Sequence, residues 1–379
     1  MPTAQINHTM LAWARERAGF SVSVFAGRCG VSEERLRRWE SGEDPLTFKQ
    51  AQTFAAKAYV PFGYLFLREP PVDKLPIPDL RTVDNRGVNR PSAELLDLIK
   101  LTLQRQQWYR DYLTHELAAP SPAVGRVSPD ATVKAIVKDM RQLLRVPAHP
   151  ERGSSDDYYR DLVTRIEAVG VLVMRESNFR HYTRPLLVEE FRGFAIADAF
   201  APIVFVNHAD APGARLFTLI HELSHIWMGI SGVSDGDEST HVTSEIKCNA
   251  VAAEFLVPEV EFRPLWEQRE EWTDNLAPLE AHFHVSKWAL ARRALTLGFI
   301  SIDQYREYIA RQKAIWDARA KKEGSGPSFH KTRNAQISKP FSRAVLSQAF
   351  NGHILLRDAG QLLGVNPAKL KRFAEEVRI

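Results

Sequence analysis

The feature that most constrains this chain is the pentapeptide His221-Glu222-Leu223-Ser224-His225. It lies in the run 215–228, which contains no Pro or Gly and has apolar residues at helical spacing, so we predict a helix there. Residues four apart share one face of a helix, so His221 and His225 can hold one Zn²⁺ between them. Glu222 can then take a proton from a water at the metal. The pattern therefore predicts a catalytic zinc site, and the alternative for each histidine taken alone is a packed core residue.

A catalytic zinc needs a third protein ligand and one open position. The segment 244–258 reads as a second helix, since Ser or Thr can cap it, alanines extend it and Pro258 limits it. Glu245 is the expected ligand on one face of this helix. Glu254 falls about half a turn away from that face and is the weaker candidate. Cys248 is either a thiolate ligand or a small buried hydrophobe, and we favour the second interpretation.

These two segments resemble the two signature helices of the ImmA/IrrE family, which are bacterial zinc metallopeptidases that act on repressors. The resemblance covers roughly residues 155–300 and includes the closing Leu-x-Pro of the second helix. It implies Zn²⁺ as cofactor and a role for each matching residue: metal ligands His221, His225 and Glu245, general base Glu222, and Asn249 as a residue that steadies the metal site.

The sequence before the first motif predicts a small sheet. Residues 171–174, 194–197 and 203–207 read as short strands. A peptide substrate could add to the edge of such a sheet through backbone hydrogen bonds. We therefore predict a mainly α fold with a small antiparallel sheet, of the α+β class, in which a zincin-like peptidase domain carries the His-Glu-x-x-His helix.

Four regions follow from these patterns. We predict a helix-turn-helix domain at 1–70, a Pro-rich linker with a helical connector at 71–150, the peptidase domain at 151–300 and a helical C-terminal region at 301–379. His282 and His284 lie in the third region and are expected to be surface or packing residues. No chemistry is predicted for the last region beyond an interaction or oligomer contact.

The first seventy residues resemble the five-helix module of Xre/Cro-type regulators, through Gly30 at the turn, Ser32 as helix cap and the closing Trp39-Glu40-x-Gly42. The recognition helix would span about 32–41, and its DNA contacts would be Arg35, Arg37 and Arg38. Acidic residues are interspersed there, and the segment 1–70 has nine Lys and Arg against seven Asp and Glu. DNA binding and a purely protein-contacting or dimerising role both stay open.

Composition fits a cytoplasmic protein without a membrane segment. The 379 residues include only two cysteines and have a formal net charge of +4, and no apolar run approaches a membrane span. The resemblance implies an endopeptidase that regulates transcription by cleaving a partner repressor or antitoxin with its own helix-turn-helix, in a stress, prophage or mobile-element response. The alternative is a DNA-binding regulator or antitoxin whose metallopeptidase fold senses a signal or binds a partner. Operator DNA and a second copy of the chain, in a homodimer, are further expected partners.

Overall fold

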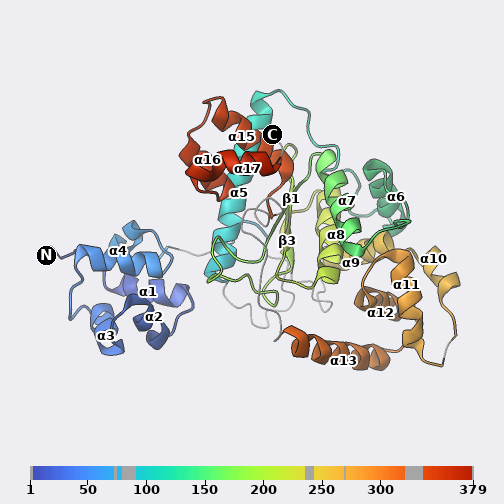
Figure 1. The fold of residues 1–379 in the computed structure, drawn as a ribbon, viewed down its shortest axis with the longest axis horizontal. Coiled ribbons are helices and arrows are strands. Elements are labelled where there is room, and N and C mark those ends of the chain that lie inside the picture. The colour runs from blue at the N-terminus through green and yellow to red at the C-terminus, as the bar shows by residue number, and fades with distance from the viewer. Residues whose placement is uncertain are drawn as a thin grey trace. The chain divides into compact units, whose positions relative to one another are not determined.

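The computed structural model describes residues 3–71, 75–78, 91–234, 243–268, 270–320 and 336–377 (Figure 1). The chain divides into two compact units. The first comprises Met1–Pro76 with Asn89–Lys100, and the second comprises Ile77–Val88 with Leu101–Ile379. Most of the predicted Pro-rich linker and the Gly/Ser-containing stretch near residue 325 lie outside the described residues. None of the described helices is long and apolar enough to cross a membrane.

The first unit is helical in its described residues. Ser21, Ser32 and Thr47 each cap a helix with the side-chain oxygen. Gly30 ends the second helix with a φ of 71°, in the left-handed region that favours glycine. Of the five predicted helices four are α-helical, and the fifth element is a 3₁₀ helix. The elements are α1 (Thr9–Arg17), α2 (Val22–Cys29), α3 (Glu33–Ser41), α4 (Phe48–Lys57) and η1 (Phe62–Phe66).

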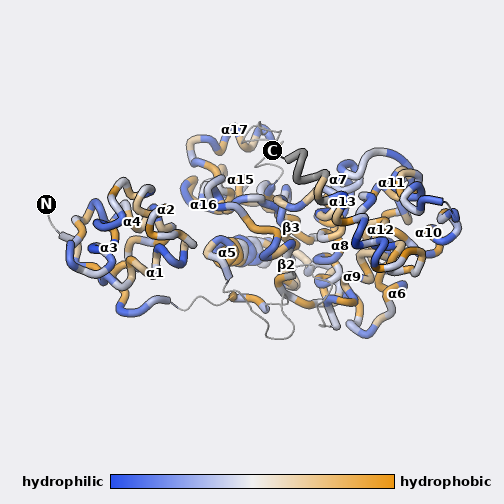
Figure 2. Tube along the Cα trace, turned by 90° about the horizontal axis from the view of Figure 1, so that it is seen from below, coloured by the Kyte–Doolittle hydropathy of each residue, from blue (hydrophilic) through white to orange (hydrophobic). Residues whose placement is uncertain are grey.

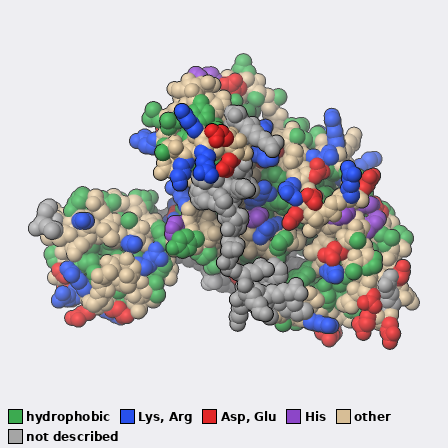
Figure 3. Space-filling view, viewed as in Figure 1, with side chains coloured by type: hydrophobic (Ala, Val, Ile, Leu, Met, Phe, Trp, Pro, Cys, Tyr) green, Lys and Arg blue, Asp and Glu red, His purple; other side chains and the backbone are tan. Residues whose placement is uncertain are grey.

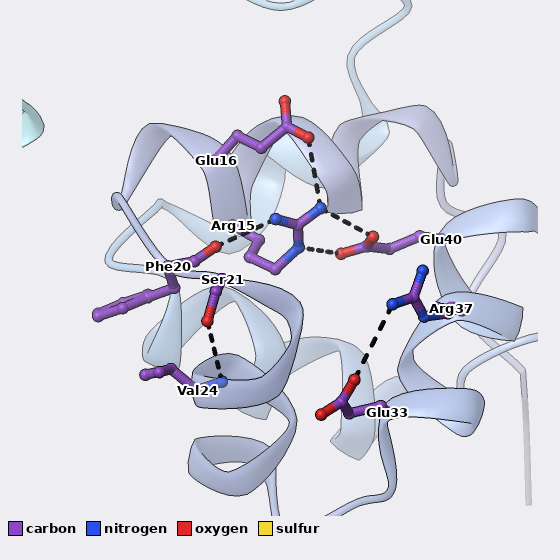
Figure 4. A network of polar contacts seen from close by, with 8 residues as sticks. All are labelled: Arg15, Glu16, Phe20, Ser21, Val24, Glu33, Arg37 and Glu40. Carbon is purple, nitrogen blue, oxygen red and sulfur yellow. Dashed lines mark hydrogen bonds and ion pairs between the residues drawn. The ribbon is translucent and has the colours of Figure 1, made fainter.

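An ion pair joins α1 and α3 in this unit (Figure 4). The guanidinium of Arg15 donates to both carboxylate oxygens of Glu40, at 2.7 and 3.1 Å. Both side chains are nearly buried, with exposed fractions of 10% and 12%. A two-bond contact of this kind fixes geometry as well as charge. Glu40, one of the acidic residues interspersed in the predicted recognition helix, therefore has a structural partner.

The second unit contains a four-stranded sheet among its described residues, in the order β1-β3-β2-β4. Strand β2 pairs antiparallel with both β3 and β4, but β1 pairs parallel with β3. The predicted antiparallel sheet is therefore a mixed one, and that detail of the prediction was wrong. The strands are β1 (Leu172–Glu176), β2 (Gly193–Ile196), β3 (Ile203–Asn207) and β4 (Gly232–Ser234).

The parallel pair has a physical cause in the sequence. Strand β3 is apolar up to its last residue and buried throughout, and four of the five residues of β1 are buried. Such strands are covered on both faces, which is typical of parallel neighbours. Figure 1 shows α7 (Ser155–Ala168) and α8 (Pro212–Met228) on one side of β1 and β3, and α5 (Ala93–His115) on the other. Figure 2 shows hydrophobic chain at the position labelled β3.

A buried ion pair ties the sheet to the helices behind it. Arg105 of α5 contacts Glu176 of β1 at 3.3 Å, with both side chains inaccessible to solvent, and also donates to the carbonyl of Leu362 at 2.9 Å. This one side chain thus links α5, the sheet and the C-terminal helices. The latter are α15 (Lys339–Phe350), α16 (Leu356–Leu363), η3 (Pro367–Lys369) and α17 (Leu370–Val377).

The remaining helices of the second unit flank α8. Helix α9 packs along α8, α6 packs on α9, and the later helices complete the same apolar core. Their bounds are α6 (Val133–Leu144), α9 (Thr243–Leu256), α10 (Glu259–Leu265), η2 (Trp272–Asn275), α11 (Leu276–Phe283), α12 (Lys287–Thr296) and α13 (Ile302–Ala320).

Candidate metal centre

Helix α8 holds the His-Glu-x-x-His motif in the core of the second unit. Pro212 stands at its first turn, where a missing N–H costs no hydrogen bond, and Gly229 ends it with a φ of 71°. From Leu219 to Met228 every residue of α8 is buried. Apolar neighbours such as Leu223 and Ile226 anchor the helix in the core, so the polar residues of the motif are fixed on a rigid element.

Helix α9 brings the predicted third ligand to this motif. Glu245 lies in the first turn of α9 and is 3% exposed, whereas a carboxylate at a helix start is usually solvated. Ala252 is completely buried on the same helix, and such a small residue allows α8 and α9 to pack closely. The sequence predicted this helix within one residue of its observed start.

The three predicted ligand side chains converge. Glu245 Oε2 lies 3.1 Å from Nε2 of His221, and Glu245 Oε1 lies 2.9 Å from Nε2 of His225. The two Nε2 atoms are 3.3 Å apart. Tetrahedral zinc with bonds of 2.0–2.1 Å holds its ligand atoms about 3.3 Å from one another. The spacing of the two imidazoles and the carboxylate therefore fits a zinc ion.

Asn249 sets the orientation of one imidazole. Its Oδ1 lies 2.9 Å from Nδ1 of His221. Because an amide oxygen only accepts, Nδ1 carries the proton and Nε2 keeps its lone pair toward Glu245 and His225. This is the outer hydrogen bond that metal-ligating histidines usually have, and the predicted supporting residue lies where it can supply it.

The pKa shifts of Glu245 and His225 favour the protonation states that a metal requires. Burial acts to raise the pKa of Glu245, but its contacts with the adjacent imidazoles of His221 and His225 outweigh burial and lower that pKa to about 2. Burial lowers the pKa of His225 below its usual value, against the opposing effect of Glu245. A carboxylate and neutral imidazoles are the protonation states that bind zinc.

Glu222 lies against strand β2. A Cβ atom built on Gly193 of β2 would stand 2.7 Å from Glu222 Oε1 and 2.8 Å from its Cγ. The strand can therefore approach the carboxylate closely only because residue 193 is glycine. Sequence reasoning missed Gly193, since a glycine at a strand start has no chemical signature of its own.

Two weaker ligand candidates lie elsewhere. Cys248 belongs to the apolar core, where burial raises the pKa of its thiol well above the usual value. It is not among the residues that converge, which fits its interpretation as a packing residue. Glu254 forms an ion pair with Arg293 and lies outside the His221 group.

The three arginines proposed for DNA contact lie on α3 of the first unit. Asp44 Oδ2 is 3.6 Å from Arg35 and 3.7 Å from Arg38, and Glu33 is 3.9 Å from Arg37. Figure 3 shows basic and acidic side chains beside one another on this unit. Each arginine thus has an acidic neighbour, although all three side chains remain between 47% and 67% exposed.

Comparison with known proteins identifies two segments. Residues 337–376, which contain α15, α16 and all but the last residue of α17, match a domain of unknown function. A search of curated proteins finds no match. Residues 166–295 match the model of the IrrE N-terminal-like domain, Peptidase_M78. This match contains β1 to β4, α8 and α9, so this segment of the second unit is similar to a metallopeptidase domain of the IrrE type.

Proposed function

We propose that this protein is a zinc-dependent endopeptidase that regulates transcription by cleaving a partner repressor or antitoxin. The observation that supports this most is the convergence of His221, His225 and Glu245, with Glu222 on the same helix as the two histidines. The match to a peptidase family over the same residues supports the hydrolytic reaction. The regulatory setting and the class of substrate come from the resemblance.

Each residue of the proposed active site has a separate role in hydrolysis. His221, His225 and Glu245 would hold the ion, which when bound would polarise the scissile carbonyl and make water a stronger acid. Glu222 takes the proton from the attacking water and later gives it to the leaving amine. Asn249 keeps His221 in its binding tautomer, and β2 limits the positions open to the Glu222 carboxylate.

The substrate would enter as a strand at the edge formed by β4. That edge lies one strand from the catalytic carboxylate, because β4 pairs with β2 and Gly193 contacts Glu222. The N–H of Val233 points outward from β4 and donates to the carbonyl of Pro78 at 3.0 Å. A substrate strand that pairs with this edge must displace Pro78, so the chain's own segment competes with substrate.

The decisive experiment is the substitution Glu222→Gln. The purified protein and zinc should be incubated with a helix-turn-helix protein that is encoded by an adjacent gene. This incubation should give a discrete cleavage product. The variant should retain stoichiometric zinc but lose cleavage by about 10²- to 10⁴-fold, as expected for a lost general base. Glu280→Gln, at a half-exposed position paired with Lys287, is the control and should cleave like the wild type. Equal cleavage by the Glu222 variant would rule out the mechanism.

A DNA-binding role of the first unit is the second candidate function. It is supported by the exposure of the Arg35, Arg37 and Arg38 side chains on a helix that follows a glycine turn. Asp44 and Glu33 would compete with phosphate for these arginines, so we expect weak binding with a steep salt dependence. An electrophoretic shift on the operon's upstream DNA, lost when Arg35 and Arg38 are both changed to Gln, would support this role. If the DNA shows no electrophoretic shift even at low salt, α3 would instead serve to contact a protein.

A further inference from the structure

A second group of two histidines and a glutamate lies in the second unit, outside the motif on α8. His149 precedes α7, Glu261 lies on α10 and His282 lies on α11. Glu261 Oε2 is 3.2 Å from Nε2 of His149 and 3.4 Å from Nε2 of His282. Three segments that are far apart in sequence thus direct one nitrogen or oxygen atom each toward a common point.

Hydrogen bonding fixes the tautomer of His149. Its Nδ1 lies 3.2 Å from the carbonyl oxygen of Pro150. A carbonyl only accepts, so Nδ1 carries the proton and the neutral ring has a lone pair on Nε2, facing Glu261. A lone pair and a carboxylate oxygen at 3.2 Å repel each other unless a cation or an additional proton lies between them.

A metal ion satisfies this group better than protons do. The rings of His149 and His282 are side by side, with centroids 4.1 Å apart. Two imidazolium rings at that separation would repel each other. One divalent ion bound by both Nε2 atoms and Glu261 instead uses the lone pairs and the carboxylate charge together.

No arginine neutralises Glu261 in the described part of the chain. The neighbouring Arg263 contacts Glu259 at 2.6 Å instead. Arg141 influences Glu261 only at longer range, because its own N–H groups donate to the carbonyls of Ala148 and Phe255. The two imidazoles are the ion-pair partners found for Glu261 among the described residues.

The donor set determines which ion would bind. Imidazole nitrogen suits zinc and its neighbours among the transition metals, whereas magnesium and calcium prefer oxygen ligands. The three side chains are between 26% and 34% exposed, so solvent can complete the coordination. No acidic residue follows either histidine as Glu222 follows His221, so this group would bind a metal without a general base.

We propose that His149, Glu261 and His282 form a second, structural zinc site. Its bound ion would join the segment before α7 to α10 and α11. Helix α10 begins directly after Pro258, at the end of α9, the helix that bears Glu245. Zinc at the second site would therefore stabilise the C-terminal end of α9, whereas Glu245 lies at its N-terminal end. Such an ion stabilises the fold rather than the transition state.

The experiment measures zinc bound to the full-length protein, by elemental analysis after dialysis and by competition with a chromophoric chelator. The wild type should bind zinc at both His/Glu groups. His282→Gln and His149→Gln should each lose one equivalent and part of the zinc-dependent rise in melting temperature, with unchanged circular dichroism. His284→Asn, two residues from His282 but outside the group, is the matched control and should bind like the wild type.

A second set of variants distinguishes zinc bound at the first group from zinc bound at the second. The double variant His221→Gln/His225→Gln should retain one equivalent of zinc and lose it when His282→Gln is added. If that double variant does not fold, the difference in bound zinc between the wild type and His282→Gln alone tests whether the second site exists. Unchanged zinc stoichiometry and affinity in both the His149 and the His282 variant would overturn the proposal, whatever the outcome for the catalytic group.

Discussion

The two groups of two histidines and one glutamate differ in burial and in support. In the first, His221, His225 and Glu245 are at most 4% exposed, whereas the members of the second are between 26% and 34% exposed. The first is held by two packed helices, and the second by two short helices and a connecting segment. The same ligand types therefore occur in two very different environments.

The identity of the ligand residues alone therefore does not define a catalytic centre. Only the first group has an acid adjacent to a ligand, Glu222, confined by a strand at Gly193. Its dry surroundings also strengthen each electrostatic interaction. The second group offers the same atoms to solvent without a base. We therefore expect substitutions in the two groups to have separable effects on chemistry and on stability.

The largest expected effect comes from Glu245→Gln. Loss of the carboxylate leaves two buried imidazoles without their anionic partner, so zinc affinity at the first group should fall by more than about 100-fold, since even outer hydrogen bonds contribute 10- to 100-fold. Peptide cleavage should fall to background. Zinc affinity is measured by competition with a chromophoric chelator, and activity by cleavage of a protein encoded by an adjacent gene.

The equivalent substitution in the second group, Glu261→Gln, is the matched comparison. It should lower zinc stoichiometry and the melting temperature while cleavage at saturating zinc continues. If Glu261→Gln abolished cleavage as fully as Glu245→Gln does, the division into a catalytic and a structural group would fail.

Gly193→Ala should have the next largest effect. The added methyl would stand 2.7 Å from Glu222 Oε1 and 2.8 Å from the carbonyl oxygen of Phe205, and the latter cannot move without the strand. Glu222 must shift, and a misplacement of about 1 Å can cost roughly 100-fold in rate. Zinc content should be unchanged, because the atoms nearest to the added methyl belong to Glu222 and Phe205 and not to the three proposed ligands.

Gly27→Ala is the control for this substitution, since a Cβ at residue 27 meets nothing within 4 Å. Cleavage kinetics of both variants, with zinc measured in parallel, give the comparison. Wild-type turnover in Gly193→Ala would show that β2 does not position the base.

Asn249→Ala should have a smaller effect, on affinity more than on turnover. It removes the acceptor for Nδ1 of His221, so zinc should bind about 10- to 100-fold more weakly. His149 provides the contrast, because its Nδ1 faces a backbone carbonyl that no side-chain substitution removes. Asn249→Asp, which retains an acceptor, should restore most of the affinity; failure of Asp to do so would argue against the orienting role.

The sequence predicted the proximity of His221, His225 and Glu245, because local periodicity sets these residues. A four-residue spacing on one helix joins His221 to His225, and Glu245 lies on one face of the second predicted helix, in agreement with the resemblance. Strand β3 was also predicted at its observed bounds, since its apolar run is uninterrupted. Direct local patterns of this kind do not depend on how distant segments pack.

Features that arise from tertiary packing were missed. The three-residue strand β4 is too short to show alternation, and the parallel pairing of β1 with β3 depends on which edge of β3 is free. His282 was expected to be a surface or packing residue, because nothing in the sequence links it to His149 or Glu261. Their proximity is visible only once α10 and α11 are folded.

His208 lies in a third kind of environment, because it is partly buried beside cations instead of a carboxylate. Burial, with Arg215 and Arg175, lowers its pKa to about 3, and Nε2 lies 3.3 Å from Nη1 of Arg215. Below pH 6.5 the unfolded chain gains a proton on this ring that the folded chain does not, so stability falls as the pH drops from 6.5 towards 3. His208→Gln should reduce the slope of unfolding free energy against pH in that window by up to about 1.4 kcal/mol per pH unit. His353→Gln, at an exposed ring, is the control. Chemical denaturation at several pH values measures both slopes, and an unchanged slope for His208→Gln would show that this imidazole is protonated equally in the folded and unfolded states.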